Sequence, residues 1–177
     1  MKNSLLLLAC ITAAFGAPPP AVGERAPAFT LMNLEGAPRQ LADSTAQGPV
    51  VLLVLRGFPG YQCPLCNRQV TEFVKNGPEF AKLGARVVMV YPGPKNNLQA
   101  KAQEFVMSKN LPPHFELLVD PDYAMTNLYN LRWDAPNETA YPSTFVIDKK
   151  GVITFAKISG SHGGRTTAAE VLAALAR

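Results

Sequence analysis

The sequence of 177 residues lacks several features that would place it in a special class of protein. Beyond the first few positions it has no apolar run near the roughly 20 residues of a membrane span. Three cysteines are too few for a disulfide scaffold. The Lys and Arg residues are scattered and the net charge is only +4, which argues against nucleic acid as a partner. Because hydrophobic residues make up 47% and charged residues 17%, the composition excludes global disorder and favours one compact domain.

The first 16 residues have the pattern of a targeting sequence. Lys2 supplies a positive start, and residues 5–11 form a short apolar region. Ala14 and Gly16 place small side chains at the two positions that a signal peptidase recognises. We therefore expect residues 1–16 to be a signal peptide that is cleaved after Gly16. The protein would then be exported, to the periplasm or outside the cell.

A less favoured alternative is a lipoprotein signal, in which Cys10 carries the lipid anchor. The apolar run before Cys10 is unusually short for such a signal. Removal of the signal peptide takes away Lys2 and lowers the net charge from +4 to +3. It also leaves Cys63 and Cys66 as the only cysteines of the mature chain. In an oxidising location outside the cytoplasm, such a pair can cycle between dithiol and disulfide.

Apolar, β-branched runs alternate with amphipathic helices through the middle of the chain. The runs that we expect to form strands are 29–31, 50–55, 86–91, 115–119, 144–148 and 152–158. The segments that we expect to form helices are 64–75, 79–83, 97–109, a short one starting at 120–122 and a last one opened by a capping box at 167–170. After the first strand, a turn at 35–36 leads into a polar loop through Gly48. This order predicts an α/β architecture with one mixed β-sheet, flanked by helices on both faces.

The strongest chemical motif is a CxxC pair, Cys63 and Cys66, between a buried strand and a helix. The first turn of a helix offers unpaired N–H groups and the positive end of the helix dipole, which together stabilise a thiolate. The two-residue spacing lets the second sulfur close a disulfide with the first. A zinc site would need about two further ligands, and only His114 and His162 are available, far apart in sequence. We therefore expect redox chemistry and no metal.

Three segments resemble a known family: 26–31 (APAFTL), 58–66 (FPGYQCPLC) and 143–148 (STFVID). The sequence is similar there to the peroxiredoxin-like alkyl hydroperoxide reductase/thiol-specific antioxidant family, the redoxin branch of the thioredoxin fold. The resemblance implies a thioredoxin-like fold for residues 17–177 and an antioxidant enzyme that reduces hydroperoxides. It also implies an external thiol reductant, either a thioredoxin-like protein or a membrane dithiol donor, with no metal or organic cofactor.

The active-site motif of that family runs from a proline to a Thr or Ser and then to the peroxidatic cysteine. Here Pro59 matches the proline, Cys66 matches the peroxidatic position, and Cys63 stands where the family has Thr or Ser. The resemblance therefore implies that Cys66 attacks the peroxide. Cys63 would then condense with the sulfenic acid that forms on Cys66.

This sequence also departs from the family at an arginine. The family has that arginine just before the first strand of the late hairpin, where this chain has Pro142. In the family the arginine stabilises the thiolate and the peroxide oxygens. The arginines that could take its place in space are Arg56, Arg132 and Arg165.

A second resemblance gives the same two cysteines different roles. Tyr141 and Pro142 look like the cis-proline loop that faces the CxxC motif in exported TlpA-like or ResA-like thiol-disulfide reductases. In that interpretation Cys63 is the nucleophile, Cys66 releases the mixed disulfide, and the substrates are protein disulfides. It predicts a cis peptide bond before Pro142. A third interpretation is a non-catalytic redoxin module that binds a partner or holds a metal through the two sulfurs.

The remaining candidates surround the CxxC motif. Those expected to line the substrate site are Arg56, Pro59, Tyr61, Tyr141 and Pro142. His162 lies on a glycine-containing loop and is expected to be solvated. Trp133, the lone tryptophan, is expected to pack in the core or on the surface.

Overall fold

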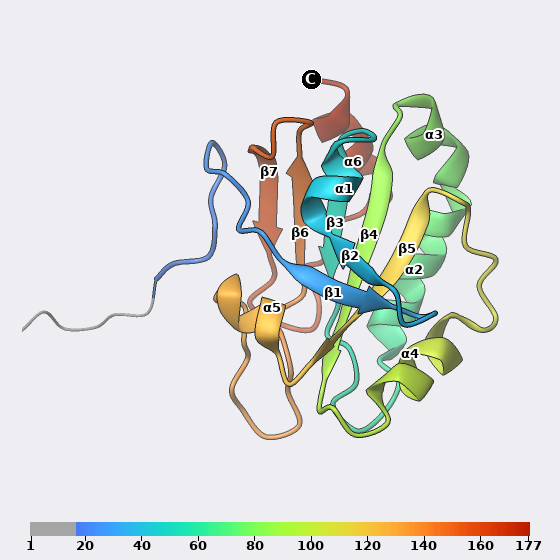
Figure 1. Cartoon of the computed structure of the whole chain (residues 1–177), viewed down its shortest axis with the longest axis vertical. Helices are drawn as coiled ribbons and strands as arrows, with labels where there is room; N and C mark the ends of the chain where they lie inside the picture. Colours follow the sequence, from blue (N-terminus) through green and yellow to red (C-terminus); the bar gives the residue numbers. More distant parts are fainter. Residues whose placement is uncertain (1–16) are drawn as a thin grey trace, which may run out of the picture.

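The computed structural model describes residues 17–177 (Figure 1). The predicted signal peptide and Cys10 therefore lie outside the described residues. Within them, seven strands form one sheet in the order β2-β1-β5-β4-β3-β6-β7. The strands are β1 (Thr30–Asn33), β2 (Pro38–Gln40), β3 (Val50–Val54), β4 (Arg86–Gly93), β5 (Phe115–Pro121), β6 (Ser143–Ile147) and β7 (Ile153–Ile158).

Helices connect these strands and cover the sheet (Figure 1). The helices are α1 (Leu41–Thr45), α2 (Pro64–Lys75), α3 (Gly77–Lys82), α4 (Leu98–Val106), α5 (Ala124–Leu128) and α6 (Ala168–Leu175). The longest, α2, has 12 residues. No helix in the described part of the chain is long and apolar enough to cross a membrane.

The central strand β3 shows why both faces of the sheet are covered. All five of its residues are buried. Because side chains alternate along a strand, Val51 and Leu53 belong to the core formed with α2, α3, α4 and α6. Val50, Leu52 and Val54 belong to the core on the opposite face, which also includes residues of α1 and α5. The predicted α/β architecture, with one mixed β-sheet flanked by helices on both faces, is confirmed.

The sheet is parallel at its centre and antiparallel toward its edges. β3 pairs in parallel with β4, and β4 with β5, whereas β1, β2, β6 and β7 pair antiparallel with their neighbours. The carboxyl ends of β3, β4 and β5 therefore meet at one end of the sheet. The loop that leads from β3 to the CxxC motif starts at this end, which is where α/β sheets usually bind ligands.

The segment that we expected to be a polar loop after β1 contains two further elements. β2 pairs antiparallel with β1, and the single turn of α1 buries Leu41 in the core. One buried leucine in a polar stretch gives almost no periodic signal, so the sequence pattern does not predict a helix of five residues.

The short helix expected to start at 120–122 begins later, at Ala124. The Asp120 carboxylate, near the end of β5, accepts the N–H groups of Met125 and Thr126 at 2.9 and 2.8 Å. A buried aspartate thus satisfies the free donors at the helix start. The sequence predicts a short helix near this aspartate, but not which N–H groups its side chain accepts and therefore not where the helix begins.

Candidate active site

The two cysteines occupy the first turn of α2, just after the carboxyl end of β3. Cys63 is the N-cap residue of α2, and Pro64 fills the first helical position, as the sequence predicts. The Cys63 side chain accepts the N–H of Cys66 at 3.3 Å. Both cysteines are free thiols, with 3% of Cys63 and 0% of Cys66 exposed. The sulfur of Cys63 is thus at the outer edge of the helix start, and Cys66 lies within the core.

These surroundings move the two thiol pKa values in opposite directions. Hydrogen bonds from the Cys66 side chain and backbone N–H, the positive charge of Arg165 and hydrogen bonding by the Arg56 side chain lower the pKa of Cys63 to about 5 against the opposing effect of burial. Burial raises the pKa of Cys66 well above its ordinary value, and the hydrogen bond to Cys63 raises it further. At neutral pH the pair therefore consists of one thiolate, Cys63, and one thiol, Cys66.

Arg165 is the arginine that reaches the thiolate. Its Nη2 group donates to Cys63 Sγ at 3.7 Å, and its Nη1 group donates to the Gln69 side chain at 3.1 Å. Its Nε group donates to the His162 carbonyl at 2.9 Å, which holds the side chain against its own loop. The sequence named Arg165 only as one of three arginines that could replace the missing family arginine. The contact joins residues 102 positions apart, so no local pattern could select it.

Arg56 lies buried beneath the same site, with 3% of the residue exposed. It pairs with Glu138 at 2.7 Å and donates to the Tyr61 hydroxyl at 2.6 Å and to the Asn137 carbonyl at 2.7 Å. Hydrogen bonding by its side chain also helps to lower the pKa of Cys63. Arg132, the third candidate, instead donates to backbone carbonyls of its own loop.

Glu138 joins the two loops that flank the CxxC motif, and no sequence pattern singles it out. One carboxylate oxygen pairs with Arg56 and the other contacts His162 Nε2 at 2.8 Å. Burial opposes ionisation of Glu138, but the hydrogen bonds from Arg56 and His162 outweigh it and lower the pKa. His162 is therefore partly exposed on its loop, as the sequence predicts, and its contact with Glu138 is an addition that the sequence does not predict.

Tyr141 and Pro142 end the loop that contains Glu138, just before β6. Tyr141 stacks on Trp133 with 4.7 Å between ring centroids, and Trp133 also packs against His162 at 5.1 Å. The peptide bond before Pro142 is trans, so the expected cis-proline is wrong. Pro142 leads directly into β6, and its carbonyl accepts the N–H of Ser159 at 2.9 Å, which continues the pairing of the hairpin.

A cleft of about 310 Å³ opens beside Cys63, between the start of α2 and α4. Cys63, Gln62 and Lys109 are among the residues that line it. Gln62 is fixed from two sides, since it accepts the Tyr91 hydroxyl at 2.7 Å and donates to the Lys101 carbonyl at 2.9 Å. Pro59 and Tyr61 belong to the loop before the motif and do not line this cleft.

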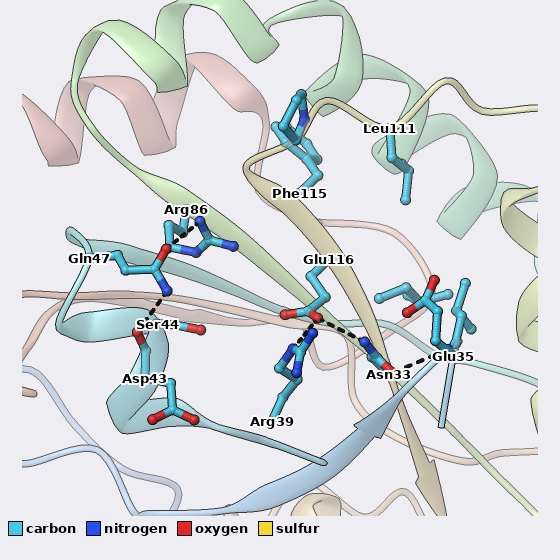
Figure 2. Close-up of a pocket in the computed structure, with 13 residues that line it drawn as sticks. Asn33, Glu35, Arg39, Asp43, Ser44, Gln47, Arg86, Leu111, Phe115 and Glu116 are labelled. Carbon is cyan, nitrogen blue, oxygen red and sulfur yellow. Dashed lines mark hydrogen bonds and ion pairs between the residues drawn. The ribbon is translucent and has the colours of Figure 1, made fainter. Parts of the chain in front are cut away.

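A larger cavity, of about 540 Å³, is lined by none of these site residues (Figure 2). Within it, Arg39 pairs with Glu116 at 2.8 Å, and Arg86 donates to Gln47 at 3.0 Å. Side chains of both charges line this cavity, and no cysteine does. Its size therefore does not make it the redox site.

The histidines of the described chain have partners other than the cysteines. His114 Nε2 contacts the Gly77 carbonyl at 3.0 Å, and His162 contacts Glu138. Across residues 17–177, no three His, Cys, Asp or Glu side chains are grouped so that they could hold a metal ion. The Cys63 sulfur instead accepts hydrogen bonds from the Cys66 N–H and from Arg165, contacts that stabilise a thiolate.

Comparison with known proteins agrees with this site. Residues 22–156 match the sequence profile of the AhpC/TSA family. The chain belongs to the AhpC/TSA family. Together with the relatives described next, this identifies it as a thiol-dependent oxidoreductase with a thioredoxin-like fold, which sets aside the non-catalytic interpretation.

Relatives with both of the expected activities are similar to this AhpC/TSA protein. It is 30% identical over 134 residues to the thiol-disulfide oxidoreductase ResA of Geobacillus thermodenitrificans. The aligned residues cover 75% of this chain and 67% of the relative. It is also 30% identical over 144 residues to a putative peroxiredoxin of Mycobacterium tuberculosis. This alignment covers 76% of this chain and 83% of the relative.

Solved structures support the fold. Peroxidoxin BcpB of Mycobacterium tuberculosis matches with a TM-score of 0.72 and 24% identity, covering 88% of this chain and 96% of that one. Prx3 of Vibrio vulnificus matches with a TM-score of 0.73 and 20% identity, covering 88% of this chain and 99% of that one. The thioredoxin-like fold implied by the sequence resemblance is thereby confirmed.

Proposed function

We propose that this protein reduces hydroperoxides and that Cys63 is the attacking thiol. The different surroundings of the two sulfurs carry the proposal: Cys63 caps α2 and accepts the Cys66 N–H and Arg165 Nη2, which lower its pKa, whereas Cys66 is completely buried, which raises its pKa. The thiolate is the nucleophilic form, so at neutral pH Cys63 is ready to attack and Cys66 is not. The family motif gives the attack to Cys66, and the proposal therefore exchanges the roles that the resemblance implies.

The chemistry then proceeds in two steps. The Cys63 thiolate attacks the terminal oxygen of the hydroperoxide, the O–O bond breaks, and the leaving alkoxide takes up a proton while Cys63 becomes a sulfenic acid. Cys66 then attacks the Cys63 sulfur, so that water leaves and a disulfide forms. An external thiol, which supplies two electrons, restores the dithiol.

Arg165 and Arg56 supply positive charge where the reaction needs it. Arg165 Nη2 lies 3.7 Å from Cys63 Sγ, close to where negative charge develops on the peroxide oxygens. The buried ion pair with Glu138 holds Arg56 in place beneath the motif. These two residues take over the role that the family gives to an arginine at the position of Pro142.

Access to Cys63 favours a small substrate. Only 3% of this residue is exposed, and the cleft that it lines measures about 310 Å³. Clefts of this size hold small molecules. A hydroperoxide can enter such a cleft more easily than a disulfide on the surface of a folded protein.

The test is peroxide consumption by the wild type, Cys63→Ser and Cys66→Ser, with dithiothreitol as reductant. We expect sustained consumption by the wild type and none above background by Cys63→Ser. Without reductant, Cys66→Ser should still consume about one equivalent, because the first step needs only Cys63. Circular dichroism of each variant controls for folding. A wild type that leaves peroxide untouched overturns the proposal, and a fully active Cys63→Ser overturns the assignment of Cys63.

Thiol–disulfide exchange is the second candidate function. The same contrast in pKa favours it, because Cys63 would attack a partner's disulfide and Cys66 would release the mixed disulfide. Similarity to a ResA protein supports it as well. Insulin reduction, measured on the same preparations, separates the two candidates. Fast insulin reduction with no peroxide consumption would replace the first candidate with the second.

We also propose that the protein is exported, on the signal-like pattern of residues 1–16. The measurement is mass spectrometry of the protein isolated from its cells. An N-terminus at Ala17 supports cleavage and export, and a diacylated Cys10 supports the lipoprotein alternative. A chain that starts at Met1 in the cytoplasm contradicts both.

A further inference from the structure

A second, smaller pocket of about 210 Å³ lies beside the CxxC motif, between α2 and the loop before α6. Arg68 of α2 and Arg165 and Thr166 of that loop are among its lining residues. Cys63 lines the neighbouring cleft and not this pocket. Arg165 connects the two spaces, because it lines the pocket and also donates to Cys63 Sγ at 3.7 Å.

The charge of the pocket is mainly positive. Arg68 is exposed and forms no ion pair with any residue in the described part of the chain. Arg165 also lacks a carboxylate partner, since its donors contact the His162 carbonyl, Gln69 and Cys63. The acidic residue of the pocket, Glu72, accepts the N–H that opens α6 at 2.8 Å. Two guanidinium groups that have no carboxylate partner favour the binding of an anionic ligand.

Thr166 adds a polar group that lacks a partner. Only 3% of this residue is exposed, and its buried hydroxyl has no hydrogen-bond partner among the described residues. Buried hydroxyl groups are almost always hydrogen-bonded, and an unpaired one is costly. A small shift of the loop that opened the pocket toward this hydroxyl would let an acceptor oxygen of a ligand supply its missing bond.

We propose that this pocket binds the carboxylate of a low-molecular-weight thiol, and that this thiol reduces the Cys63–Cys66 disulfide. The inference rests on the proposed function, which needs an external thiol to complete each cycle. A volume of about 210 Å³ fits a small acidic group rather than the surface of a protein. A carboxylate held by Arg68 and Arg165 brings the attached thiol toward the Cys63 sulfur.

The oxidation state of Cys63 favours this order of events. In the reduced protein, Arg165 faces the Cys63 thiolate. Once Cys63 is in a disulfide its negative charge is gone, and the Arg165 guanidinium can accept a carboxylate instead. The pocket therefore attracts an anion most strongly in the state that needs reduction.

The reduction itself is ordinary thiol–disulfide exchange. The thiolate of a first molecule attacks the Cys63 sulfur, the S–S bond breaks, and Cys66 leaves and takes up a proton. The thiolate of a second molecule attacks the mixed disulfide at the sulfur of the first molecule and releases Cys63 as a thiolate. Two small thiols are oxidised to one disulfide, and the protein disulfide is reduced to a dithiol.

The test compares two reagents on the oxidised protein: mercaptosuccinate, which carries carboxylates, and 2-mercaptoethanol, which is neutral. We expect the ratio of their reduction rates to fall by about 1.4-fold to fivefold in Arg68→Gln, the range for loss of one exposed ion pair. The matched control is Lys149→Gln, which removes one positive charge from the exposed turn between β6 and β7 and should leave the ratio unchanged. The intrinsic reactivity of each thiol cancels, because every protein meets the same two reagents.

A second variant, Thr166→Val, tests the unpaired hydroxyl. We expect it to lower the same ratio without lowering the midpoint of urea unfolding, because it removes a buried unpaired group and keeps the side-chain shape. Equal ratios in the wild type, Arg68→Gln and Thr166→Val overturn the proposal, and fast reduction by a thioredoxin-like protein would then assign the reductant to a protein dithiol. Peroxide consumption with 2-mercaptoethanol reports separately on the proposed function.

Discussion

At the scale of single residues, the site depends on two identical side chains in different surroundings. Cys63 caps the helix, where the Cys66 N–H and the arginines stabilise its negative charge. Cys66, one turn further on, is completely buried, and burial disfavours its charged form. The structure thus favours a thiolate at Cys63 and a thiol at Cys66, three positions apart, as the proposed roles require.

The first prediction concerns pH. Because the pKa of Cys63 is lowered to about 5, its thiolate forms as the pH rises through that value. The rate of alkylation by iodoacetamide should therefore rise between about pH 4 and pH 6 and stay level to pH 8. Cys66→Ser is the protein to use, because it leaves one thiol and keeps a hydroxyl donor. A rate that rises only near pH 8 to 9, as for an ordinary thiol, would contradict the account.

The second prediction concerns Arg165. Arg165→Gln removes the positive charge next to Cys63 Sγ and should raise the pKa of Cys63. Alkylation at pH 5 should become roughly threefold to tenfold slower, and peroxide turnover should fall with it. Arg39→Gln, in the unrelated cavity of Figure 2, is the matched control and should change neither rate. Equal effects of the two substitutions would show that general charge, not the contact, is responsible.

The sequence predicts the reactive groups of the site better than their partners. The CxxC spacing and Pro64 at the first helical position are local features, and the structure has them where the sequence places them. Arg165 and Glu138 come from loops far along the chain, and their contacts depend on how β6, β7 and α6 fold back onto α2. A local sequence pattern does not show which distant residues come into contact. Arg165 could therefore be predicted only as one of three arginines, and Glu138 could not be predicted.

At the scale of secondary-structure elements, two loops enclose the start of α2. One connects α5 to β6 and contains Glu138, and the other connects β7 to α6 and contains His162 and Arg165. The contacts of Glu138 with Arg56 and His162 hold both loops to the strand that precedes the motif. The position of Arg165 over Cys63 therefore follows from where α6 begins and where this loop is held.

The third prediction tests the start of α6. Thr167 and Glu170 form a capping box, as the sequence predicts, and it lies directly after the Arg165 loop. Thr167→Ala should lower the free energy of unfolding by about 1 kcal/mol, as for loss of an N-cap side chain, when measured by urea denaturation. Thr167→Ser keeps the hydroxyl and should stay close to the wild type. The cap would be irrelevant if both substitutions destabilised the protein equally.

The elements that sequence predicts are those with strong periodic patterns. β3, β4 and β5 are apolar and β-branched because they are buried on both faces, and each appears where expected. β2 and α1 were missed because they are short and mostly polar, and pairing with β1 and one buried leucine hold them in place. Tertiary contacts decide such elements.

At the scale of the whole molecule, the sheet brings the chemistry of three distant segments to one end. Arg56 and the CxxC motif follow directly after β3. β6 begins next to the carboxyl end of β3, where Ser143 pairs with Val54. The loop after β7 returns to the same end with Arg165. The fold class follows from alternating strands and helices, but the contacts behind the proposed exchange of roles between Cys63 and Cys66 arise only when these segments assemble.

The location of the sulfenic acid tests the central claim most directly. Cys66→Ser and Cys63→Ser would each be treated with one equivalent of hydrogen peroxide in the presence of dimedone, and the adduct mapped by mass spectrometry. The account predicts an adduct on Cys63 in Cys66→Ser and none on Cys66 in Cys63→Ser. An adduct on Cys66 in Cys63→Ser, with no adduct on Cys63 in Cys66→Ser, would contradict the assignment of Cys63 as the attacking thiolate.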